Sequence, residues 1–127
     1  MNKKFVLGLL TLLVLSVPLA PASENLFQFQ APDIDGEKLS LRQFKGQVVL
    51  VVNTASKCGY THQYEGLEKL YSQFKARGFV VLGFPSDDFW QEYNSNNEIK
   101  EFCEGFQISF PLFAEGPVRG SVKQEVF

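Results

Sequence analysis

Two uninterrupted apolar runs, each followed by a helical pattern, constrain the fold of this chain most strongly. The first run covers residues 47–53 and the second covers residues 79–84. Neither run alternates apolar with polar residues, and this predicts strands that are buried on both faces of a parallel sheet. Because parallel strands need crossover connections, the order strand–helix–strand–helix predicts an α/β fold with right-handed crossovers.

The two helical patterns have recognisable ends. Thr61 is a candidate cap for a helix that continues to about Arg77, where Gly78 is the stop signal. Ser95 and Glu98 match a capping box at the start of the second helix. The predicted apolar face of that second helix is formed by Ile99, Phe102, Cys103 and Phe106.

The remaining segments are short. Residues 31–36 are rich in turn formers, so residues 27–30 and 38–41 are predicted to pair as a small hairpin. Residues 110–113 are predicted to be extended, and no pattern is visible in residues 116–127. A chain of 127 residues with no internal linker is expected to form one domain.

The N-terminal segment has the features of a targeting signal. Residues 1–22 begin with two lysines, continue with an apolar run over residues 5–17 and end in Ala-Pro-Ala. This pattern predicts a secretory signal peptide that is cleaved after Ala22, with an uncleaved membrane anchor as the alternative. Residues 23–127 are then an exported, periplasmic domain with no stable membrane insertion, in a compartment where disulfides form.

Composition limits the chemistry that this chain can perform. The formal net charge is −2, and basic residues do not cluster, which argues against a nucleic-acid partner. One histidine and two cysteines cannot fill a four-ligand zinc site without carboxylates, so no metal or cofactor is expected. The reactive side chains to consider first are therefore Cys58, Cys103 and His62.

Cys58 lies between the first predicted strand and the helix that follows it. A helix N-terminus and the neighbouring Lys57 favour a thiolate at this position. A thiolate attacks a peroxide to give a sulfenic acid, which a second thiol closes into a disulfide, and the other thiol is Cys103. The absence of Cys-x-x-Cys disfavours a dithiol exchanger. A protease pair of Cys58 with His62 has poor geometry at a helix start.

Structural readings of the same residues stay open at this point. Cys58 can be a structural thiol of a secreted protein, and Cys103 can be a small apolar side chain in the core. Gln91 can be a solvated loop amide. Asp87 and Asp88 form an adjacent carboxylate pair, which is more typical of a solvated loop than of a metal site.

Several blocks of the sequence resemble the glutathione peroxidase family. The longest is Val52-Asn-Thr-Ala-Ser-Lys-Cys-Gly-Tyr-Thr61, followed by Gly83-Phe-Pro85, and the resemblance extends over roughly residues 27–120. It implies a thioredoxin-like fold and the reduction of hydrogen peroxide or organic hydroperoxides. By this resemblance Cys58 is the peroxidatic residue, Gln91 the catalytic glutamine and Cys103 the resolving cysteine. The implied reductant is a thioredoxin-like protein, with glutathione as the alternative.

The chain also departs from the family pattern. Ser86-Asp-Asp-Phe89 stands where many members have Cys-Asn-Gln-Phe, and the stretch before Gln91 is one residue shorter, with Trp90 in it. The family's catalytic Trp-Asn segment would follow Phe127, so the sequence resembles a C-terminally truncated member. We expect an open sheet edge and low stability. The alternative function is a non-catalytic secreted thioredoxin-like domain, or an inactive truncated relative, with a structural disulfide.

Overall fold

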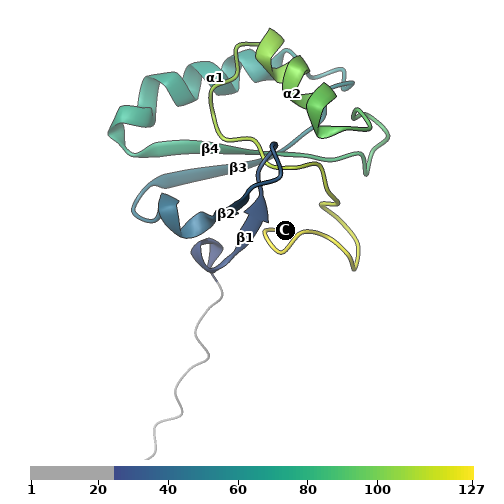
Figure 1. Cartoon of the computed structure of the whole chain (residues 1–127). Coiled ribbons are helices and arrows are strands. Elements are labelled where there is room, and N and C mark those ends of the chain that lie inside the picture. The colour runs from purple at the N-terminus through teal and green to yellow at the C-terminus, as the bar shows by residue number, and fades with distance from the viewer. Residues whose placement is uncertain (1–24) are drawn as a thin grey trace, which may run out of the picture.

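The computed structural model describes residues 25–127, so the predicted signal peptide at residues 1–22 lies outside the described residues. The described part begins with a short 3-10 helix, two short strands and a second 3-10 helix, and then alternates strands with helices (Figure 1). The elements in order are η1 (Leu26–Gln28), β1 (Gln30–Pro32), β2 (Lys38–Ser40), η2 (Leu41–Phe44), β3 (Val48–Thr54), α1 (Gln63–Phe74), η3 (Lys75–Arg77), β4 (Phe79–Pro85) and α2 (Asn96–Gly105).

The central feature is the parallel pair of β3 and β4, which α1 connects. Val48 pairs with Phe79 at one end and Thr54 pairs with Pro85 at the other. This register confirms the predicted strand–helix–strand unit and the α/β class. It also brings the carboxyl ends of both strands, and the loops that follow them, to the same edge of the sheet.

A short extended segment packs against the other edge of β4. Leu112 forms a parallel bridge with Gly83, as the extended prediction for residues 110–113 requires. A Cβ atom at Gly83 would lie 2.8 Å from Leu112 Cδ2 and 3.1 Å from Phe110 Cε2. Glycine at this position therefore leaves room for the Leu112 and Phe110 side chains, which pack directly on the β4 backbone.

The two central strands differ in burial. Residues 80–85 of β4 are buried, as predicted, but β3 is only partly covered and Val48 is 68% exposed. The prediction that both strands are buried on both faces is therefore wrong for β3. Within residues 25–127, β3 is hydrogen-bonded to β4 alone, so its outer edge is not covered by another strand.

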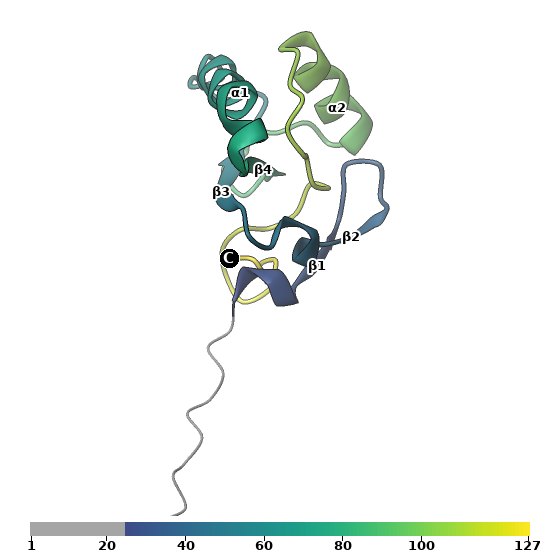
Figure 2. The same ribbon diagram turned by 90° about the vertical axis from the view of Figure 1, so that its left-hand side faces the viewer.

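Helices and hairpin lie on opposite sides of the β3–β4 pair (Figure 2). On one side α1 and α2 cover a core of Tyr64, Val81, Ile99, Cys103 and Phe110. On the other side the β1–β2 hairpin and the C-terminal segment cover a core of Ala31, Leu41, Phe44, Val80, Leu82, Phe84 and Phe113. Successive β4 side chains point to opposite sides, so this one strand supplies both cores.

The helix ends match the sequence predictions only in part. Ser95 caps α2, since its Oγ accepts a hydrogen bond from Glu98 N–H at 3.3 Å. Thr61 is not the cap of α1, which begins at Gln63 after His62 with no side-chain cap. The hairpin is shifted, with Gln30 opposite Ser40. No helix in the described part of the chain is long and apolar enough to cross a membrane.

Candidate functional site

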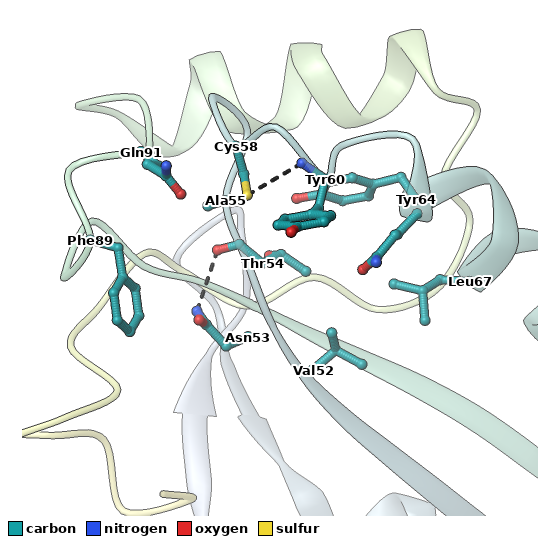
Figure 3. A pocket seen from close by; sticks show the side chains of 11 residues that line it. Val52, Asn53, Thr54, Ala55, Cys58, Tyr60, Tyr64, Leu67, Phe89 and Gln91 are labelled. Atoms are coloured by element: carbon teal, nitrogen blue, oxygen red, sulfur yellow. Dashed lines mark hydrogen bonds between the residues drawn. The ribbon is translucent and has the colours of Figure 1, made fainter.

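A pocket of about 340 Å³ opens at the carboxyl end of β3, between the loops that follow β3 and β4. Figure 3 shows how side chains from the end of β3, the start of α1 and both loops surround this space. Apolar and aromatic groups line much of it, together with a few polar ones. The lining residues are Val52, Asn53, Thr54, Ala55, Cys58, Tyr60, Gln63, Tyr64, Leu67, Phe89 and Gln91.

Cys58 contributes its sulfur to this pocket from the loop between β3 and α1. The thiol is free and half-buried, and Tyr60 N–H donates a hydrogen bond to Sγ at 3.5 Å. This contact holds the sulfur against the turn that leads into α1. The cation expected beside the sulfur is engaged elsewhere, since Lys57 Nζ lies 4.4 Å from the centroid of the Tyr93 ring.

Gln91 lines the same pocket from the loop that follows β4 (Figure 3). Its main-chain carbonyl oxygen accepts a hydrogen bond from the main-chain N–H of Lys57 at 2.7 Å, and this bond ties the two loops together next to Cys58. The structure therefore brings Cys58 and Gln91 to one pocket, although they are 33 positions apart in the sequence.

The two aromatic residues before Gln91, Phe89 and Trp90, lie in different environments. Phe89 lines the pocket, and its ring lies 4.9 Å from the guanidinium carbon of Arg119. Trp90 points away from the lining, is 85% exposed and has a left-handed backbone with a φ of 56°. Of the two, only Phe89 shapes the space in front of the sulfur.

Cys103 lies in α2, does not line the pocket and is 1% exposed. Burial raises the pKa of its thiol to about 11, and the negative charge of Glu92 acts in the same direction. Both cysteines are free, so the disulfide of the alternative function is not formed in this structure. Cys103 therefore reaches the site that Cys58 and Gln91 share only through Tyr64, a lining residue that its thiol contacts from α2.

The sequence analysis did not single out Glu92, yet its carboxylate is buried beside the loop that carries Cys58. Both carboxylate oxygens accept a hydrogen bond from Ser56 N–H, at 3.1 and 3.0 Å, and Tyr93 N–H donates to Oε1 at 2.8 Å. Burial raises the pKa of this carboxyl although the hydrogen bonds oppose the effect. Its position directly after Gln91 is the only sequence signal that could have indicated it.

The other candidate residues have structural or solvent-facing positions. Asp88 Oδ2 accepts hydrogen bonds from the N–H groups of Val118 and Arg119, and Asp87 Oδ1 accepts one from Glu92 N–H. These carboxylates therefore tie the loop to other backbone segments. The exposed His62 packs loosely against Tyr60 and lies outside the pocket lining.

A free, half-buried cysteine that shares a pocket with a glutamine, at the carboxyl edge of a parallel sheet, defines a single-thiol site on an α/β domain. Comparison with known proteins identifies the family of this domain. The family model described as glutathione peroxidase matches residues 26–127. The chain belongs to the glutathione peroxidase family.

Individual relatives agree with this assignment. The chain is 46% identical over 110 residues to a hydroperoxy fatty acid reductase of Synechocystis, covering 85% of this chain and 65% of the relative. It is 47% identical over 98 residues to a glutathione peroxidase of Lactococcus lactis, covering 76% and 62%. It is 45% identical over 105 residues to a glutathione peroxidase-like peroxiredoxin of Schizosaccharomyces pombe, covering 81% and 66%. The chain spans less than two thirds of the length of these relatives.

Solved structures define the fold class. The crystal structure titled Trgpx in apo form superposes with a TM-score of 0.63 at 37% identity, covering 83% of this chain and 62% of that one. A thioredoxin family protein from Chlorobium tepidum gives a TM-score of 0.59 at 19% identity, covering 70% and 58%. The predicted thioredoxin-like fold is thereby confirmed.

Proposed function

We propose that this protein is a thiol peroxidase that reduces hydrogen peroxide or organic hydroperoxides through Cys58. The observation that carries the proposal is that Cys58 and Gln91 line one pocket, with Tyr60 N–H directed at the sulfur. A thiolate with an amide in the same pocket is suited to a reaction in which negative charge moves from sulfur to oxygen. The names of the family relatives, which include a hydroperoxy fatty acid reductase, support the same chemistry.

The first step is attack of the Cys58 thiolate on the terminal oxygen of the hydroperoxide. A sulfur–oxygen bond forms, the oxygen–oxygen bond breaks, and the alkoxide takes up a proton and leaves as an alcohol, or as water when hydrogen peroxide is the substrate. Sulfur is oxidised to a sulfenic acid while the peroxide is reduced. The Gln91 amide hydrogen-bonds the sulfur or the peroxide oxygen. The apolar groups of Val52, Leu67 and Phe89 suit the organic part of a larger substrate.

The second step uses Cys103 as the resolving thiol. Its sulfur attacks the Cys58 sulfenic acid, a disulfide forms, and the hydroxyl leaves as water with the proton that Cys103 releases. Because Cys103 is buried in α2, this step requires local opening of that helix. A thioredoxin-like protein then reduces the disulfide, with glutathione as the alternative reductant of the sulfenic acid.

We further propose that residues 1–22 direct export and are then removed. N-terminal sequencing of the mature protein tests this proposal, and we expect the mature chain to start at Ser23.

The test is hydroperoxide consumption by the full mature chain, with a thioredoxin system and separately with glutathione. We expect Cys58→Ser to abolish turnover with either reductant, and Cys103→Ser to abolish it with thioredoxin. Retention of turnover by Cys58→Ser would reject the proposal. A Cys103→Ser chain, in which no second thiol can resolve the product, that shows no sulfenic acid at Cys58 after peroxide treatment would favour the non-catalytic alternative.

A further inference from the structure

Glu92 is a carboxylate kept in a position where an apolar side chain would be easier to bury. Its exposure is 3%, and burial of an ionised group costs free energy unless hydrogen bonds compensate. The compensating donors are backbone N–H groups of Ser56 and Tyr93. Ser56 precedes Cys58 by two residues, so this costly group is attached directly to the loop that presents the sulfur.

Two neighbouring contacts join the same pair of loops, which run antiparallel to each other at this point. Ser56 N–H donates to the Glu92 side-chain carboxylate. The next peptide, Lys57 N–H, donates to the main-chain carbonyl oxygen of Gln91 at 2.7 Å. Consecutive peptides of one loop therefore bind consecutive residues of the other. Because of this pairing, a displacement of Glu92 also shifts Gln91 relative to Cys58.

The buried hydroxyl groups near these two loops do not replace Glu92 as the link between them. Among the described residues, the buried hydroxyls of Thr54, Ser56 and Tyr64 make no hydrogen bond of ordinary geometry, and the Ser56 hydroxyl faces the Glu92 carboxylate, whose pKa it lowers. The side chain that links the Cys58 loop to the Gln91 loop by hydrogen bonds is thus Glu92. Charge-assisted hydrogen bonds are the strongest that a side chain offers for this purpose.

We infer that Glu92 is a positioning residue, which fixes the separation of Cys58 Sγ and the Gln91 amide by binding Ser56 N–H. The inference rests on the proposed function, since it concerns the two residues that react with the peroxide. It predicts that loss of the Glu92 carboxylate leaves the sulfur reactive in general but poorly placed for the peroxide.

The test compares two reagents on a single thiol. In a Cys103→Ser background, Cys58 is the only cysteine, and its rate constants with hydrogen peroxide and with iodoacetamide are measured separately. Alkylation needs an accessible sulfur, whereas peroxide reduction also needs the amide in place. We expect Glu92→Gln to slow the peroxide reaction about 10-fold and Glu92→Ala about 100-fold. Both variants should keep the alkylation rate within about 2-fold.

Glu68→Gln is the matched control. Glu68 is also a carboxylate that holds a backbone N–H, that of Ser109 at 2.7 Å, but it lies outside the pocket lining. Its replacement should leave the ratio of the two rate constants unchanged. Because Glu92 acts through Gln91, Glu92→Gln should have less than about a 2-fold further effect in a Gln91→Ala background.

Four outcomes distinguish failure of the positioning role from failure of the proposed function. Equal slowing of both reagents in Glu92→Gln, or full additivity with Gln91→Ala, would overturn the positioning role. If the reference protein does not react with hydrogen peroxide, the proposed function fails, and amide hydrogen exchange then tests the inference independently. We expect exchange at Ser56 to be faster in Glu92→Gln than in Glu68→Gln, and equal exchange would overturn the inference.

Discussion

Local opening of α2 should control the chemical access to Cys103, and the N-cap of that helix is the place to perturb it. Cys103 is 1% exposed, and its thiol has a pKa of about 11 in place of the ordinary 9.0. At pH 8 such a thiol carries ~100-fold less thiolate than an ordinary one. Alkylation of Cys103 should therefore proceed through molecules in which α2 has opened.

Ser95 sets the free energy of that opening, since its Oγ accepts the hydrogen bond from Glu98 N–H at 3.3 Å. Replacing a Ser cap by Ala costs ~1 kcal/mol, which corresponds to a roughly 5-fold larger open population. We expect Ser95→Ala to increase the rate of Cys103 alkylation by iodoacetamide by about that factor. Peptide mapping by mass spectrometry measures the rates at Cys103 and Cys58 in the same reaction.

Ser40→Ala is the control for this experiment, because Ser40 caps η2, on the opposite side of the sheet from α2. It should leave the Cys103 rate unchanged, and unfolding in urea should make both cysteines react at similar rates. If Cys103 in the folded protein is alkylated as fast as in urea, the argument from burial is refuted. If Ser95→Ala lowers stability without changing the Cys103 rate, the opening does not involve the start of α2.

Three further predictions concern stability, which urea denaturation measures. Gly83→Ala should lower the free energy of unfolding by ~1–3 kcal/mol, because the new Cβ would lie 2.8 Å from Leu112 Cδ2. Gly66→Ala, at the fourth residue of α1 and with no atom outside the nearby helix backbone within 4 Å of the new Cβ, should raise it by ~0.5–1 kcal/mol. For Glu68, partial burial is outweighed by hydrogen bonds from Ser109 and Ser72, which lower the pKa of the carboxyl. Its contribution to stability is therefore present above the ordinary pKa of 4.5 and lost as the pH falls, so Glu68→Gln should show a weaker loss of stability between pH 7 and pH 3.

The sequence predicted the fold where burial and local signals agree. The two apolar runs became β3 and β4, and the capping residue Ser95 began α2 as expected. The burial of β3 could not be predicted, because an apolar run does not reveal how many strands pair with it. Thr61 failed as a cap because the turns from Cys58 onward lead directly into α1.

The sequence predicted where the site lies on the sheet, but not the hydrogen bonds that hold its two loops together. Cys58 follows a strand that was recognisable, and the carboxyl edge of the sheet followed from the order of elements. The contact of Glu92 with Ser56 N–H spans 36 positions and involves a backbone donor, which leaves no mark in the sequence. Long-range contacts between a side chain and a backbone group depend on loop shape, and local patterns do not specify that shape.

The exposed position of Trp90 gives the protein an internal optical reporter. It is the one tryptophan of the chain, it directly precedes Gln91, and 85% of its surface faces solvent. Its fluorescence therefore comes from a single known place beside the thiol pocket. Any rearrangement of that loop on oxidation should alter the emission, so rapid-mixing measurements can follow the cycle without an attached dye.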